Sequence, residues 1–172
     1  NVFLFMAESA GFGMRPPLRT TLITAADPKV NPLLADAVTA ATAVTNAVAG
    51  ADIRWQTVPM PFEVYADGMD LVVFEEFGSG EAALHLADEL ERNDLLRDEG
   101  YRRRFRKDYE ARFTPRVWHR DFHDATVVEA PDEALVGRSF GEIAESRGLH
   151  PVDLFLDLVV EHGTALRWKT TI

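Results

Sequence analysis

The chain has 172 residues, of which 47% are hydrophobic, a share typical of globular proteins and too high for a disordered chain. It carries 28 acidic and 18 basic residues, and the resulting net charge of −10 disfavours nucleic acid and anionic membrane surfaces as partners. Cysteine is absent, which excludes disulfides, thiolate zinc sites and a cysteine nucleophile in this stretch. No apolar run approaches the ~20 residues that span a bilayer. We therefore expect a packed core and a cytoplasmic location.

Apolar runs stand at both ends of the chain, at residues 2–6 and 166–172. Both predict strands, and neither has the polar or Gly/Pro-rich character usual at a domain boundary. We expect strands cut from a longer sheet, so that the chain is an internal piece of a larger α/β protein. The alternative is a domain whose two terminal strands pair with each other. Open strand edges in a cut piece favour self-association between copies.

The first sixty residues predict a βαβ unit. Residues 20–26 (TTLITAA) are apolar and β-branched, and residues 52–58 (DIRWQTV) return to strand character. Between them, an Ala-rich helix is expected from Pro32, with Asn31 as N-cap and Gly50 as the stop. The two strands should run parallel, with ligand sites beyond their carboxyl ends. Asp27 lies at one such end and is a candidate catalytic residue, or else a turn former before Pro28.

Residues 61–131 differ in composition and predict a smaller inserted subdomain with helices at 81–90 and 95–113 and a strand at 125–130. The last part returns to regular α/β character. Ser139 and Glu142 fit a capping box, opening a helix that ends near Gly148. Pro151 begins a second helix whose buried stripe is Val152, Phe155, Leu156 and Val159, and which Gly163 closes. Residues 166–172 complete the chain as a strand.

Residues 125–161 resemble a stretch of the N-acyl-D-amino-acid deacylases of the amidohydrolase superfamily. The resembling positions are 136–144 (VGRSFGEIA), Arg147-Gly148, 151–153 (PVD) and 156–158 (LDL), with 55–61 (WQTVPMP) upstream. The resemblance implies a (β/α)8 TIM-barrel fold, in which 1–60 form a barrel βαβ segment, 61–131 an inserted small α/β subdomain, and 132–172 the return to barrel helices and a strand. It also implies zinc, which activates water to hydrolyse the amide bond of an N-acylated D-amino acid, and an Asp that acts as general base and acid.

The sequence departs from the family pattern in its metal ligands. The His-x-His pair and the catalytic Asp with its SD.G.H-like surroundings are not in this stretch, and the two strand ends at 24–27 and 56–59 hold no histidine. We therefore expect zinc in the full-length parent and none in this segment. The candidate metal ligands here are His119 and His123, with Asp121 and Asp124 nearby; the alternative is a pair of solvated loop histidines.

Other charged groups are interpreted structurally. Glu75 and Glu76 are expected at an exposed edge, since neighbours in a strand face opposite ways. The basic run at 102–107 is expected on a solvated helix with internal ion pairs rather than in a phosphate site, and His150 and His162 at helix ends. The sequence thus predicts a fragment of a metal-dependent deacylase, inactive alone, whose partners are the rest of its own chain and a small amide. The alternatives are a non-catalytic α/β ligand- or protein-binding module and a barrel relative that has lost its metals.

Overall fold

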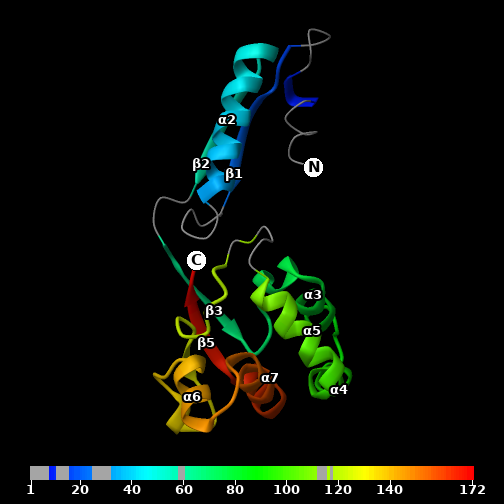
Figure 1. Ribbon diagram of the computed structural model, residues 1–172, viewed down its shortest axis with the longest axis vertical. Helices are drawn as coiled ribbons and strands as arrows, with labels where there is room; N and C mark the ends of the chain where they lie inside the picture. Colours follow the sequence, from blue (N-terminus) through cyan, green and yellow to red (C-terminus); the bar gives the residue numbers. More distant parts are fainter. Residues whose placement is uncertain (1–7, 11–15, 25–31, 58–60, 112–115, 117) are drawn as a thin grey trace. The chain divides into compact units, whose positions relative to one another are not determined.

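The structure is a computed structural model that describes the chain except residues 1–7, 11–15, 25–31, 58–60, 112–115 and 117. The chain divides into two compact units, Asn1–Pro61 and Phe62–Ile172 (Figure 1). The first boundary therefore falls beside the one expected after residue 60. The predicted strand at 2–6 and the candidate Asp27 lie outside the described residues.

The first unit contains the predicted βαβ motif. Strand β1 (Arg19–Thr24) pairs parallel with β2 (Asp52–Thr57), and helix α2 (Pro32–Ala49) connects them. Asn46 joins the helix to the sheet, because its side-chain amide donates to the Ile53 carbonyl at 2.7 Å and its oxygen accepts from the Ile53 N–H at 2.9 Å. Gly50 ends the helix region at φ +63°, a conformation that favours glycine. The parallel βαβ prediction is confirmed.

The second unit is built around a three-stranded sheet of order β3–β5–β4, in which both pairings are antiparallel. Its elements in chain order are β3 (Glu63–Asp67), η2 (Val72–Glu76), α3 (Gly78–Leu84), α4 (Glu89–Arg97), α5 (Glu99–Glu110), β4 (Thr126–Glu129), η3 (Glu133–Leu135), α6 (Phe140–Arg147), α7 (Pro151–His162), η4 (Gly163–Ala165) and β5 (Arg167–Thr171).

Local capping signals set the helix ends in this unit. Ser139 and Glu142 form the predicted capping box, Gly148 ends α6 in the left-handed region at φ +65°, and Pro151 opens α7. Asp88 and Asp98 accept backbone N–H bonds at the starts of α4 and α5. Asp88 and Asp98 explain why the observed helices begin and end at other residues than the helices expected at 81–90 and 95–113. Each aspartate has an extended backbone that interrupts the helical residues, and its side chain caps the helix that follows.

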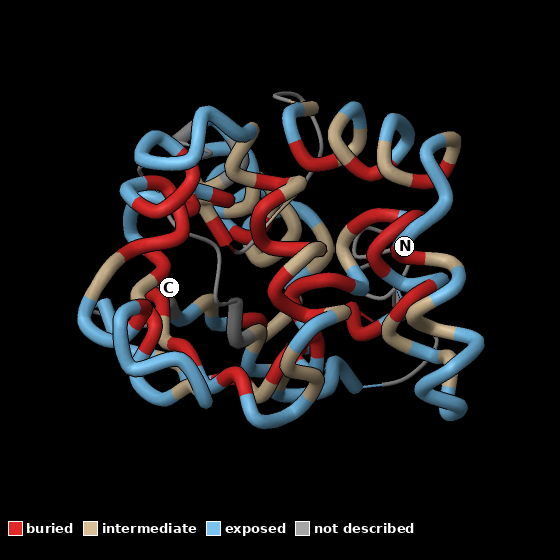
Figure 2. The backbone as a smooth tube through the Cα atoms, turned by 90° about the horizontal axis from the view of Figure 1, so that it is seen from below, coloured by how far each residue is buried: buried red, intermediate tan, exposed pale blue. Residues whose placement is uncertain are grey.

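Buried residues run through the elements of the second unit (Figure 2), and ten of the 27 buried core residues described in this unit are aromatic. The Phe155 ring lies within 4.8–5.6 Å of the rings of four others, Phe74, Phe122, Phe140 and Trp168. All the predicted stripe residues of α7 are at most 2% exposed, which confirms the buried face of that helix. Aromatic pairs at these separations add to the stabilisation that burial of their area provides.

Two predictions for the second unit are wrong. Residues 62–172 share one core and one sheet, so no unit boundary lies at 131. Strand β5, expected as an interrupted barrel strand, is central in its sheet and pairs antiparallel on both sides, whereas the strands of a TIM barrel run parallel. Its apolar character reflects burial between two neighbours: Trp168 is fully buried and Thr170 is 2% exposed.

Candidate functional site

The structure separates the two histidines proposed as metal ligands. His119 Nε2 lies 3.1 Å from Asp124 Oδ2, while His123 Nε2 lies 3.9 Å from Glu145 Oε1. The His123 ring also packs against Gly141, where an added Cβ would lie 2.2 Å from Nδ1. Residues 118–124 are not helical, so the i, i+4 spacing does not place both rings on one face.

The described residues around these two histidines therefore do not form a complete zinc site. Among the residues that the structure describes, no group of three or more His, Cys, Asp or Glu side chains could hold a metal. A catalytic zinc needs three protein ligands around one point. Any zinc of the parent protein must take its ligands from elsewhere than this described part.

Asp124 instead ties its loop to the end of β5. Its Oδ2 accepts the Thr171 N–H at 3.2 Å, and the Thr170 hydroxyl lies 3.5 Å away. The same hydroxyl accepts from the Trp118 indole N–H at 3.0 Å. His119 is thus held between a buried tryptophan and a fixed carboxylate. The effect of this arrangement is to anchor the loop.

Arg120 anchors the same loop from inside the core. It has φ +57°, an unusual conformation for a non-glycine residue, and its side chain is fully buried. The guanidinium donates to the Asp108 carbonyl at 2.9 Å, lies 3.3 Å from Glu76 Oε2 and stacks over the Phe77 ring at 4.7 Å. Burial lowers the pKa of Arg120, and the Glu76 carboxylate opposes that shift. The prediction of an exposed edge is wrong for Glu76, whose side chain is only 13% exposed.

The basic run on α5 serves packing. Arg102 bonds Asp157 at 2.6 Å, and Arg106 holds Asp153 through two hydrogen bonds, so both arginines join α5 to α7. Arg103 makes the internal pair with Glu99 at 3.7 Å that the sequence predicts. His150 caps α7 by accepting the Val152 N–H at 3.2 Å and contacts Glu110 of α5. The structural interpretation of His150 is therefore confirmed.

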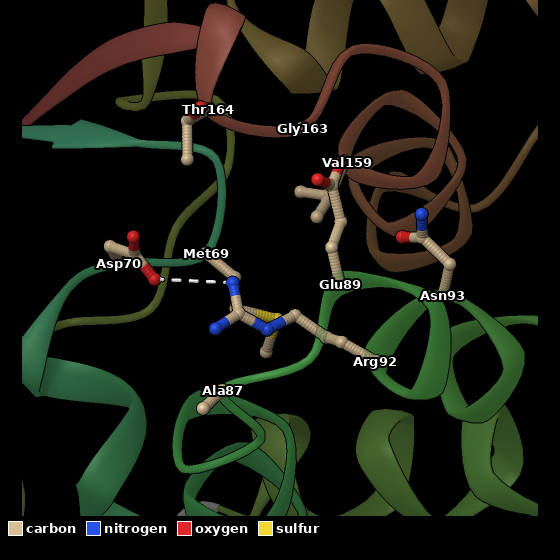
Figure 3. A pocket seen from close by; sticks show the side chains of 9 residues that line it. All are labelled: Met69, Asp70, Ala87, Glu89, Arg92, Asn93, Val159, Gly163 and Thr164. Atoms are coloured by element: carbon tan, nitrogen blue, oxygen red, sulfur yellow. Dashed lines mark hydrogen bonds and ion pairs between the residues drawn. The ribbon is translucent and has the colours of Figure 1, made fainter.

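A small pocket lies between α4, α7 and the turns that flank β3 and β5 (Figure 3). Its volume of about 210 Å³ is below the range usual for small-molecule sites. Arg92 points across it to Asp70 at 3.3 Å and donates twice to the Leu86 carbonyl, at 2.7 and 3.2 Å. Because the guanidinium is used to hold these segments together, we interpret the pocket as a packing defect between elements.

A polar surface covers the side of the β1–β2 sheet that faces away from the buried Ile53. Side chains alternate along a strand, so Arg19, Thr21, Ile23, Asp52, Arg54 and Gln56 share this side, and all but Ile23 are polar. Arg19 Nε donates to Asp52 Oδ2 at 2.8 Å, and this hydrogen bond lowers the pKa of Asp52. Arg54 Nε lies farther from the same carboxylate, at 3.7 Å. Periodicity alone could have shown this surface in the sequence, but we did not single it out.

Relatives in two mycobacterial species match nearly the whole chain. Proteins of Mycobacterium tuberculosis (strains CDC 1551 / Oshkosh and ATCC 25618 / H37Rv) and of Mycobacterium bovis, each named only as an uncharacterized protein, are 49% identical to it over 173 residues. The match covers 99% of this chain but only 28% of the length of those relatives. No family model and no solved structure matches the chain.

Proposed function

We propose that this chain is one part of a larger metal-dependent amidohydrolase of the N-acyl-D-amino-acid deacylase type, which hydrolyses the amide bond of N-acylated D-amino acids. The observation that carries the proposal is the block at residues 125–161. Its resembling positions include the Ser139–Glu142 capping box, the left-handed Gly148 and the Pro151 that opens α7. Residues that resemble the family therefore occupy positions with a defined backbone role, as a shared local fold requires.

The first unit supports the proposal in a second way. A parallel pair with a connecting helix is the repeating element of α/β barrels, and parallel sheets occur with both faces covered. The two strands β1 and β2 are too few for an independent sheet. The mycobacterial relatives are more than three times as long as the matched stretch, which leaves ample chain for further βα units.

The described residues supply framework rather than chemistry in this proposal. We place the complete zinc-ligand set and the general base outside the described part, within which no group of three or more His, Cys, Asp or Glu side chains could hold a metal. Within that part, no helix is long and apolar enough to cross a membrane. Together with the lack of cysteine, this supports a cytoplasmic enzyme, which we include in the proposal.

The test uses the full-length protein of which, in this proposal, the 172-residue chain is one part. We expect it to contain zinc by elemental analysis and to release amino acid from N-acetyl-D-leucine faster than from the L-enantiomer. Chelation should abolish the activity and added zinc should restore it. The 172-residue chain serves as the matched control and should be inactive.

Three results would decide against the proposal in different ways. Bound zinc without amide hydrolysis would remove the deacylase assignment but keep a metal-dependent hydrolase. Neither zinc nor hydrolysis would favour a barrel relative that has lost its metals. Activity in the isolated 172-residue chain would show that the catalytic groups lie within it.

A further inference from the structure

The polar surface of the β1–β2 sheet is unusual for parallel strands. Such sheets are normally covered on both faces and are apolar on both. Here one side carries Ile53, only 2% exposed, while the opposite side carries Arg19, Thr21, Ile23, Asp52, Arg54 and Gln56, of which only Ile23 is apolar. Were the rest of a longer chain to cover this side, its charges would need polar partners there, because a buried charge without a partner is costly.

The order of these side chains along β2 points to its carboxyl end. Asp52 opens the strand, Arg54 follows on the same side, and Gln56 is the next-to-last residue of the strand. Ligands of parallel α/β sheets bind beyond the carboxyl ends of the strands. Arg54 and Gln56 are therefore the polar groups of β2 nearest the position where a ligand is expected.

Arg54 is available for an anion because Arg19 holds the aspartate. Arg19 and Asp52 are register partners and their contact is 2.8 Å, whereas Arg54 reaches the same carboxylate only at 3.7 Å. Two guanidiniums therefore share one carboxylate through its two oxygens, which leaves a net positive charge at this point of the surface. The side chain of Arg54 is 67% exposed in this chain. An arginine fork matches the two oxygens of a carboxylate, and it does so better than a lysine can.

The chemistry of the two side chains fits the proposed substrate. Successive residues on one face of a strand stand about 6.8 Å apart, so a guanidinium and a carboxamide lie next to each other along β2. An N-acyl amino acid carries a carboxylate beside a secondary amide. Arginine pairs with the first group, and the glutamine side chain can both donate to and accept from the second.

We propose that Arg54 and Gln56 form a substrate subsite, in which Arg54 binds the carboxylate and Gln56 orients the amide group of an N-acyl-D-amino acid. This inference rests on the proposed deacylase function and assigns part of its substrate recognition to this chain. It explains why two polar residues stand on the uncovered side of β2 near its carboxyl end.

The test compares two substrates in the full-length protein. N-acetyl-D-leucine has the carboxylate and N-acetyl-D-leucinamide lacks it. Arg54→Leu should lower the ratio of their kcat/KM values about 10- to 100-fold, as the loss of a charged hydrogen-bonded pair implies. Arg54→Lys should recover part of the ratio. Gln56→Leu should lower kcat/KM for both substrates alike, by about tenfold.

Arg103→Leu is the matched control, since Arg103 is an exposed arginine on α5 whose loss changes the charge equally. It should leave both kcat/KM values within about twofold, since an exposed ion pair contributes little. Unchanged melting temperatures would separate recognition from folding. An active wild type whose substrate ratio survives Arg54→Leu would overturn the subsite and leave the deacylase proposal standing.

If the wild type hydrolyses neither substrate, the deacylase proposal fails and calorimetry with N-acetyl-D-leucine decides the subsite. Binding that is lost in Arg54→Leu but kept in Arg103→Leu supports it. No binding to the wild type overturns it as well.

Discussion

Gly68 is a position where a single added carbon should be costly for two separate reasons. Its φ is +57°, and a Cβ built there would lie 2.6 Å from the Gly163 carbonyl oxygen. Its own N–H donates to the Leu166 carbonyl at 2.7 Å, and its carbonyl accepts from the Trp168 indole at 2.7 Å. A methyl group here must therefore displace backbone that is fixed on both sides, rather than a side chain that can rotate away.

The magnitude follows from two separate costs. Placing an L-residue in the left-handed region costs about 1–2 kcal/mol. Forcing extra volume into fixed packing costs about 1–3 kcal/mol more. We expect Gly68→Ala to lower the free energy of unfolding by about 2–5 kcal/mol. Gly148→Ala is the matched control. Gly148 has φ +65° and nothing lies within 4 Å of the added Cβ, so this substitution should carry only the cost of the left-handed conformation.

Guanidinium unfolding followed by tryptophan fluorescence measures both variants. A Trp55→Phe background restricts the signal to Trp118 and Trp168, which both lie in the second unit. Equal losses in Gly68→Ala and Gly148→Ala would show that backbone conformation alone sets the cost. That result would refute the close contact between the turns at Gly68 and Gly163.

Two further predictions concern charged groups of the second unit. The Ser139 backbone N–H lowers the pKa of Glu142, so the charged form stabilises the fold above the unfolded pKa of about 4.3 and this contribution is lost as pH falls through the folded value. Glu142→Gln should therefore destabilise the chain at neutral pH and match the wild type near pH 2, and a pH-independent difference in urea unfolding would contradict this. Arg120→Met should cost about 3–5 kcal/mol because it removes a buried guanidinium that contacts Glu76, the Asp108 carbonyl and the Phe77 ring, and adding Glu76→Leu should restore part of that loss. A double variant no more stable than Arg120→Met alone would argue against the buried pair.

The elements that the sequence predicted well are those with local signals. The helix α2 follows from an alanine-rich run between Pro32 and Gly50, and α6 from the Ser139–Glu142 pair. Parallel pairing of β1 with β2 follows because a long helix connects them. Each of these depends on residues within one segment and its immediate connection, which periodicity and capping rules describe directly.

The place of β5 could not be predicted in this way. A strand of five residues such as RWKTT is compatible with an edge, a barrel wall or the middle of a small sheet, and its partners come from distant parts of the chain. Glu63 pairs with Thr171, and Val127 with Trp168. The chosen partners leave neither edge of β5 open.

The same distinction between local and distant contacts applies to the candidate site residues. His119 and Asp124 are five positions apart and their pairing was within reach of the sequence, but Thr170 and Thr171, which fix the carboxylate, come from β5. The burial of Glu76 depends on Arg120, whose left-handed conformation no local pattern signals. The alternation of side chains along β1 and β2 was sufficient to predict their polar surface from the sequence.

The central position of β5 also affects how the protein folds during its synthesis. Strands β3 and β4 have no hydrogen-bonded contact with each other, and both pair with a strand made about a hundred residues after β3 begins. Until Arg167–Thr171 leaves the ribosome, the sheet cannot close, and the aromatic side chains of Phe74, Phe140 and Phe155 lack their contact with Trp168. We therefore expect the nascent chain to expose apolar surface, and to be prone to aggregation, until β5 has been made.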